Sequence, residues 1–187
     1  MKIIRKILYP LFSIFLIYRS YDLMRYLMAT QPQSFDFLET LSISFLLPLF
    51  ITGIFAFPGF AYRTNKILPL SYYTLKNPDR LELVYRLLGV RYFNYLLLIY
   101  WGRKKNRLKY FDGTRRGLSN FIYQSKQSEV GHLAAFVTIL IVSMLLLTNG
   151  YTILVAMITG INIIGNLYPI ILQRHHRVRI EKLVDAK

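Results

Sequence analysis

The chain has 187 residues, of which 54% are hydrophobic and 16% aromatic, and its 24 Lys and Arg against 9 Asp and Glu give a formal charge of +15. This apolar and aromatic content excludes a disordered polyelectrolyte, and the absence of cysteine excludes a disulfide scaffold, a thiol nucleophile and a cysteine-ligated zinc site. A soluble basic nucleic-acid binder would explain the charge but not the long uncharged apolar runs, whereas an integral membrane protein explains both.

The first predicted membrane segment is the apolar run Ile7–Tyr18. It is long enough to cross the bilayer only if Lys2, Arg5 and Lys6 extend to the membrane surface. A basic start before a short apolar run is also typical of a secretory signal peptide, but no small-residue cleavage site follows Tyr18. We therefore expect a retained first span.

Two further apolar stretches are long enough to span, which requires about 20 predominantly apolar residues. Leu41–Ala61 contains no charged residue and is the second predicted span. Residues 130–173 also lack Lys, Arg, Asp and Glu, but this stretch is too long for one helix. Its middle, Thr148-Asn149-Gly150, is a turn signal. The stretch therefore predicts a helical hairpin, with spans near His132–Leu147 and Tyr151–Gln173.

Basic residues concentrate in the N-terminal residues, in the connection 62–129 and in the tail from Arg174, whereas residues 19–40 carry more acidic than basic side chains. Because cytoplasmic loops carry the excess of Lys and Arg, we expect four spans with both termini in the cytoplasm.

The predicted fold class is an all-α integral membrane protein with about four transmembrane helices and a basic cytoplasmic helical segment between the second and the third. The predicted organisation is a two-span membrane region at 1–61, the basic amphipathic segment at 62–129, a transmembrane hairpin at 130–173 and a basic cytoplasmic tail at 174–187.

The cytoplasmic segment contains one clear amphipathic helix. Asn77-Pro78-Asp79 predicts its start, with Asn as the cap and Pro at the first helical position. Its apolar side chains recur with helical spacing before Gly89, which we expect to end it; they are Leu81, Val84, Tyr85 and Leu88. The polar opposite face suggests a helix on the membrane surface. Tyr92–Trp101 is too short to span and predicts an interfacial or re-entrant piece.

A dense basic run at 103–109 is followed by Asp112-Gly113. One interpretation is a patch attracted to anionic lipid, at about 1 kcal/mol per charge. The other is a site for a phosphorylated substrate such as coenzyme A. Charge alone favours the lipid interpretation.

Glu129 and His132 lie three residues apart where the third span begins, so they share a helix face. A carboxylate beside an imidazole fixes its tautomer and raises its basicity, as a general base requires. The alternative is an interfacial pair at the helix start, where a glutamate is favourable in any case.

Amides follow on one side of the fourth span, at Asn162, Asn166 and Gln173. Lipid cannot satisfy them, so they are expected to face the other spans, either in helix–helix hydrogen bonds or toward substrate. Gln173 also opens a basic cluster that ends at Arg179.

The predicted hairpin brings the cytoplasmic ends of its two spans together. Glu129 and His132 are then expected near Arg174 and Arg177, an arrangement suited to acyl or phosphoryl transfer. A metal site that combines this pair with His175 or His176 is disfavoured by the basic neighbourhood, so we predict no metal.

These residues resemble a known family. Glu129-Val-Gly-His132, an apolar hairpin, and Asn166 followed seven positions later by the Gln-Arg-x-x-Arg-x-Arg block resemble the glycosyl-4,4'-diaponeurosporenoate acyltransferase family of bacterial carotenoid biosynthesis. Trp101, the basic run and Asp112-Gly113 are similar to that family's Trp-Lys…Asp-Gly segment. The block at a fixed distance from Asn is the most specific part.

The resemblance implies transfer of a fatty acyl group from an acyl thioester to a hydroxyl of a glycosylated lipid or carotenoid at the cytoplasmic leaflet. At the matching positions, side-chain chemistry predicts His132 as the base and Glu129 as its partner. The candidate substrate-binding residues are Trp101, Asp112, Asn166, Gln173, Arg174, Arg177 and Arg179.

The expected acyl donor is acyl-CoA or an acyl carrier acting as co-substrate, with no permanently bound cofactor. The expected partners are membrane lipid, the lipid-like acceptor and other enzymes of the same pathway, and nucleic acid is not expected. The expected location is the bacterial inner (cell) membrane.

Two other functions remain open. One is a non-catalytic membrane subunit that binds anionic lipid or a partner enzyme through its basic face. The other is a transferase with a lipid-pyrophosphate donor, which would need a divalent metal. The acids of the cytoplasmic segment are well separated in sequence, which disfavours it; they are Asp79, Glu82, Asp112 and Glu129.

Overall fold

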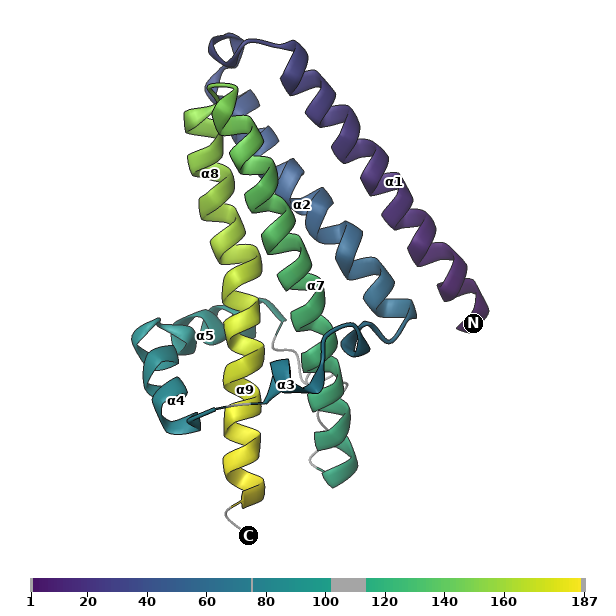
Figure 1. The fold of residues 1–187 in the computed structure, drawn as a ribbon, viewed down its shortest axis with the longest axis vertical. Helices are drawn as coiled ribbons and strands as arrows, with labels where there is room; N and C mark the ends of the chain where they lie inside the picture. Colours follow the sequence, from purple (N-terminus) through teal and green to yellow (C-terminus); the bar gives the residue numbers. More distant parts are fainter. Residues whose placement is uncertain (1, 75, 102–113, 186–187) are drawn as a thin grey trace. The chain divides into compact units, whose positions relative to one another are not determined.

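The computed structural model describes residues 2–74, 76–101 and 114–185, and the regular structure within these ranges is entirely helical, as predicted (Figure 1). In chain order the elements are α1 (Lys2–Ala29), η1 (Pro32–Ser34), α2 (Phe37–Ala61), η2 (Thr64–Lys66), α3 (Leu70–Tyr73), α4 (Pro78–Leu87), α5 (Val90–Trp101), α7 (Arg115–Thr148), α8 (Thr152–Asn162), η3 (Ile163–Leu167) and α9 (Tyr168–Asp185).

The chain forms two compact units that alternate along the sequence. The first combines the residues up to Thr64 with Gly131–Leu167, and the second combines Asn65–Val130 with the C-terminal residues from Tyr168. The long helix α7 contributes its first half to the second unit and its second half to the first.

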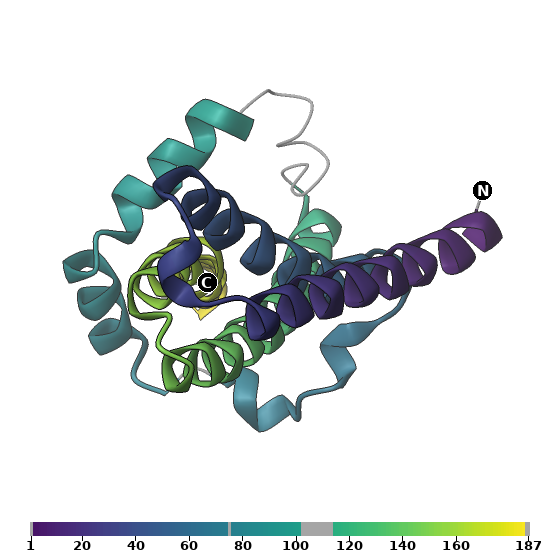
Figure 2. The same cartoon turned by 90° about the horizontal axis from the view of Figure 1, so that it is seen from above.

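In the first unit, α1 runs antiparallel to α2, which also packs against α8 (Figures 1 and 2). Burial of apolar side chains drives this packing. The buried core draws on α1, α2, α7 and α8 and consists of Leu27, Ile43, Leu47, Ile51, Ile139, Leu146, Tyr151, Leu154 and Ile158.

The start of α2 is set by a capping box. Asp36 accepts a hydrogen bond from the backbone N–H of Glu39 at 2.8 Å, and the Glu39 carboxylate accepts one from the backbone N–H of Asp36 at 3.1 Å. The two side chains satisfy donors that would otherwise lack partners at the helix start. The helix therefore begins at Phe37, four residues before the predicted span Leu41–Ala61.

Three of the described helical segments are long and apolar enough to cross a membrane: Phe37–Ala61, Gly117–Thr148 and Thr152–Ile180. The chain is therefore a membrane protein. The predicted first span lies inside α1, whose apolar run has charged residues at both ends, and α1 is not among the three. The total of four spans stays a prediction.

The predicted break in the apolar hairpin is confirmed between α7 and α8. Gly150 has a φ of +83°, which a glycine adopts without a steric cost. Its N–H donates to the carbonyl of Leu147 at 3.0 Å, and the N–H of Tyr151 donates to that of Leu146 at 3.1 Å. This pair of hydrogen bonds is the Schellman motif, which satisfies the last carbonyls of a helix.

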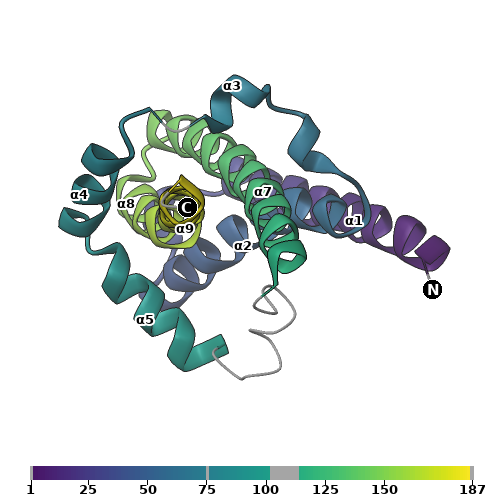
Figure 3. The same cartoon turned by 90° about the horizontal axis from the view of Figure 1, so that it is seen from below.

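In the second unit, α4 and α5 pack against α9 (Figure 3). Their buried core consists of Tyr85, Val90, Leu172 and Val178. Gly89 has a φ of +69° and follows the end of α4, as predicted. Asn77 precedes α4, but its backbone is left-handed and its side chain makes no capping hydrogen bond, so the predicted cap is wrong in its mechanism.

The apolar face predicted for α4 is only partly buried. Tyr85 is buried and Leu81 packs on the same core, whereas Val84 and Leu88 are exposed. α5 has 12 residues, about 18 Å at 1.5 Å per residue, and is too short to span.

Candidate functional site

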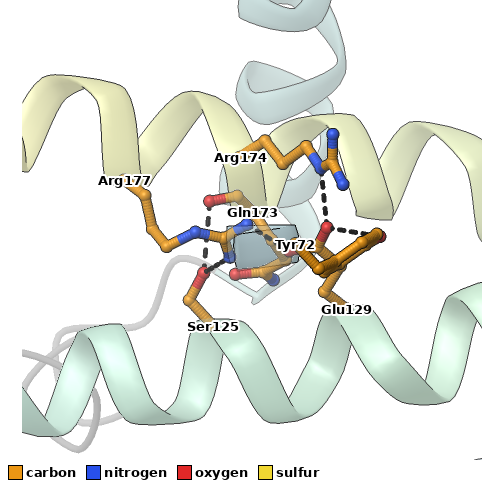
Figure 4. Close-up of polar contacts among 6 residues, drawn as sticks. All are labelled: Tyr72, Ser125, Glu129, Gln173, Arg174 and Arg177. Carbon is orange, nitrogen blue, oxygen red and sulfur yellow. Dashed lines mark hydrogen bonds and ion pairs between the residues drawn. The ribbon is translucent and has the colours of Figure 1, made fainter. Parts of the chain in front are cut away.

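A fully buried carboxylate organises the second unit. The side chain of Glu129, on α7, has no solvent-exposed surface. Its Oε1 accepts hydrogen bonds from Nε of Arg174 at 2.7 Å and from the hydroxyl of Tyr72 at 2.9 Å (Figure 4). Its Oε2 accepts a hydrogen bond from Nη2 of Arg177. Two guanidinium groups from α9 therefore bind this one carboxylate through charge-assisted hydrogen bonds.

The two arginines differ in how they are held. Arg177 is only 3% exposed, and its Nη1 also donates to the hydroxyl of Ser125 at 2.9 Å. That hydroxyl in turn donates to the backbone carbonyl of Gln173 at 3.1 Å. The side chain of Arg174 is 31% exposed and donates to Glu129 through Nε (Figure 4). Arg174 is thus the more accessible of the two guanidinium groups.

Tyrosines from α3 cover the same cluster. The guanidinium carbon of Arg174 lies 4.7 Å from the ring centre of Tyr72, and that of Arg177 lies 5.6 Å from the ring centre of Tyr73, both within cation–π range. Nζ of Lys126 lies 4.9 Å from the ring centre of Tyr73. The cluster thus combines three cations with the carboxylate of Glu129 and carries excess positive charge.

The ionisation of these tyrosines is suppressed. Burial raises the pKa of Tyr73 to about 12, and the nearby Glu129 carboxylate adds to the effect. Burial likewise raises the pKa of Tyr72, and the Glu129 carboxylate raises it further, against the opposing charge of Arg174. Both phenols are therefore neutral near pH 7, and Tyr72 donates its proton to Glu129 in a hydrogen bond.

A second polar cluster lies in the first unit. Nδ1 of His132, on α7, lies 3.0 Å from Oδ1 of Asn166. Asn166 belongs to η3, a π-helical turn, a distortion frequent at functional sites. Its Nδ2 donates to Oδ1 of Asn162 at 3.0 Å and to the Thr52 hydroxyl at 3.1 Å. The half-buried imidazole is therefore held by an amide network.

The structure pairs the predicted site residues differently from the sequence-based expectation. Glu129 was expected to orient His132, but its oxygens bind Arg174, Arg177 and Tyr72, while His132 bonds to Asn166. The predicted association of Glu129 with the arginines is present.

The four other predicted residues lie on α9, at the end of α5 or outside the described residues. Gln173 takes part through its backbone carbonyl. Arg179 is exposed. Trp101 ends α5. Asp112 and the basic run 103–109 lie outside the described residues.

Sequence reasoning missed Tyr72, Ser125 and Thr52. Ser125 precedes Glu129 by four residues on one helix, a spacing that places both on the same face and could have identified it. Tyr72 and Thr52 carry no comparable signal, because they reach the clusters from elements distant in sequence.

Within the ranges that the structure describes, no group of three His, Asp or Glu could hold a metal ion. His175 and His176 instead have aromatic neighbours. The ring centre of His175 lies 6.0 Å from that of Tyr85, and the ring centre of His176 lies 5.5 Å from that of Phe121.

Comparison with known proteins agrees with these motifs. A model of the glycosyl-4,4'-diaponeurosporenoate acyltransferase family matches residues 69–186, a range that includes both polar clusters except Thr52. No curated protein and no solved structure matches the chain. Because the family match covers more than half of the 187 residues, the chain belongs to the glycosyl-4,4'-diaponeurosporenoate acyltransferase family and is a membrane acyltransferase of carotenoid biosynthesis.

Proposed function

We propose that the protein transfers a fatty acyl group from an acyl thioester to a sugar hydroxyl of a glycosylated carotenoid or lipid, at the cytoplasmic leaflet. The observation that carries the proposal is the hydrogen bond between Nδ1 of His132 and Asn166. It occupies one ring nitrogen and leaves Nε2 to accept a proton. The family match supports the reaction class.

In the proposed reaction, Nε2 of His132 removes the proton of the acceptor hydroxyl as its oxygen attacks the thioester carbonyl. The tetrahedral intermediate then collapses, the carbon–sulfur bond breaks, and the leaving thiolate takes the proton back from the imidazolium. The products are an ester and a free thiol, and the histidine returns to its neutral form. A positioned general base of this kind accelerates proton transfer by about 10²–10⁴-fold.

We assign the arginine cluster to the acyl donor. Acyl-CoA and acyl carriers both carry phosphate, and the side chain of Arg174 is 31% exposed whereas that of Arg177 is only 3% exposed. Glu129 is then a structural counter-ion that holds the guanidinium of Arg174 in place, with Arg177 and Tyr72 as its other partners.

Purified protein in lipid nanodiscs tests the proposal when it is supplied with acyl-CoA and a glycosylated carotenoid. Mass spectrometry should detect an ester whose mass equals that of the acceptor plus the fatty acid minus water, together with free CoA. Omission of either substrate should abolish the product. Absence of an ester with both CoA and acyl-carrier donors would contradict the proposed reaction.

A further inference from the structure

The amides near His132 form a chain with a fixed direction. Nδ2 of Asn162 donates to the backbone carbonyl of Phe136 at 3.1 Å, and Nδ2 of Asn166 donates to Oδ1 of Asn162 at 3.0 Å. Oδ1 of Asn166 then lies 3.0 Å from Nδ1 of His132. Asn162 and Asn166 are 0% and 1% exposed, so water does not compete for their amide groups.

The backbone carbonyl at one end decides the orientation of every group in the chain. A carbonyl can only accept a hydrogen bond, so the side of Asn162 that faces Phe136 must be its NH₂ group. Its oxygen therefore faces Asn166, which must donate a hydrogen bond from its own NH₂ group. The Asn166 oxygen is then the atom that faces His132, and an amide oxygen can only accept. Nδ1 of His132 must carry the hydrogen.

Thr52, the other neighbour of Asn166, cannot determine the orientation of the Asn166 amide. Its hydroxyl lies 3.3 Å from Oδ1 and 3.1 Å from Nδ2 of Asn166. Because a hydroxyl both donates and accepts, it can satisfy either orientation of the amide. The orientation therefore depends on Asn162 alone among the described partners of Asn166.

We infer that Asn162 is a positioning residue that, through Asn166, fixes His132 in the Nδ1–H tautomer with the lone pair on Nε2. Asn162 has no contact with the imidazole in this scheme and acts only by orienting the amide between them. The catalytic use of this tautomer rests on the proposed function, in which Nε2 takes the proton of the acceptor. The tautomer itself is a property of the resting protein and can be measured without substrate.

Nitrogen-15 NMR of the imidazole rings measures the tautomer directly, since protonated and unprotonated ring nitrogens have well separated chemical shifts. The chain contains three histidines, and a His132→Gln spectrum identifies the signals of His132 by their loss. At a pH well above the ordinary histidine pKa of about 6.5, wild-type His132 should show a protonated Nδ1 and an unprotonated Nε2. A wild-type spectrum with the hydrogen on Nε2 would overturn the inference without the need for a further variant.

Asn162→Leu and Thr52→Val form the matched pair of variants. Asn162→Leu removes the directing amide at similar volume, so His132 should show signals of both tautomers, and kcat should fall in proportion to the lost Nδ1–H fraction. Thr52→Val should keep the wild-type tautomer. A pure Nδ1–H spectrum in Asn162→Leu would overturn the role of Asn162. A shifted tautomer with unchanged kcat would support that role and contradict the use of His132 as the base.

Discussion

Glu129 on α7 and Arg174 on α9 form an ion pair, with Oε1 of the carboxylate 2.7 Å from Nε of the guanidinium, although 45 residues separate them in sequence. Arg177 and Tyr72 also donate to the same carboxylate. The carboxylate thus joins two guanidinium groups and a phenol within the second unit.

Replacement of Glu129 should destabilise the protein far more than loss of an exposed ion pair. Glu129→Gln leaves two arginines with an uncharged partner, and a broken buried ion pair typically costs about 3–5 kcal/mol. Asp22→Asn is the matched control, because its partner Arg19 lies three residues away and both side chains are about half exposed. That change should cost at most about 1 kcal/mol. Thermal unfolding in detergent should show a large fall in midpoint for Glu129→Gln only; similar shifts in both variants would contradict the burial argument.

Variants of Arg174 and Arg177 should separate an effect on donor binding from an effect on stability. Arg174→Gln removes the guanidinium assigned to the donor phosphate, and a hydrogen bond to a charged group is worth about 1.5–3 kcal/mol, so KM for acyl-CoA should rise about tenfold or more. Arg177→Gln removes the buried guanidinium that bonds Ser125 and should chiefly lower the unfolding midpoint. Steady-state kinetics and thermal unfolding on both variants make the comparison. Equal rises in KM with equal midpoints would refute the division of roles.

Much of this architecture follows from local sequence signals. The length of the uncharged apolar runs indicated the apolar helices, and Gly150 and Gly89 indicated turns that need a positive φ. Partners brought together by long-range packing were not predictable in this way. The Glu-x-x-His spacing suggested that Glu129 hydrogen-bonds to His132. Spacing along one helix does not show which residues of other helices bind the same carboxylate, and here the arginines of α9 bind it.

The tyrosine cluster predicts a loss of stability at alkaline pH. The folded protein raises the pKa of Tyr73 to about 12, whereas an unfolded tyrosine has a pKa of about 10. The neutral phenol therefore stabilises the fold fully below pH 10, and this contribution is lost as the pH rises from about 10 toward 12. Unfolding midpoints measured across this range should fall less steeply in Tyr73→Phe than in wild type.

Tyr95→Phe is the control for this experiment, because Tyr95 is exposed on α5 and should leave the alkaline slope unchanged. At neutral pH, Tyr73→Phe should be nearly neutral for stability, since the buried Tyr73 hydroxyl has no hydrogen-bond partner among the described residues. An alkaline slope identical in wild type and Tyr73→Phe would show that this phenol is not the titrating group.

Two glycine substitutions should change stability in opposite directions. Gly150→Ala places a side chain at a φ of +83°, which costs about 1–2 kcal/mol. The added Cβ would lie 3.6 Å from Pro32, an ordinary contact, so the cost is conformational. Gly160→Ala lies inside α8, where the added Cβ has no atom within 4 Å, and should stabilise by about 0.5–1 kcal/mol. Thermal unfolding of the two variants checks the signs, and stabilisation by Gly150→Ala would contradict the turn geometry.

The most direct test of His132 as the catalytic base is ester formation by His132→Ala in nanodiscs, measured beside its thermal unfolding. His176→Ala serves as the control, because it removes a histidine that has no assigned role in the reaction. We expect His132→Ala to lose about 100-fold or more of its kcat while its unfolding midpoint stays close to that of wild type, and we expect His176→Ala to remain active. Ester formation by His132→Ala within a few-fold of the wild-type rate would show that His132 is not the catalytic base.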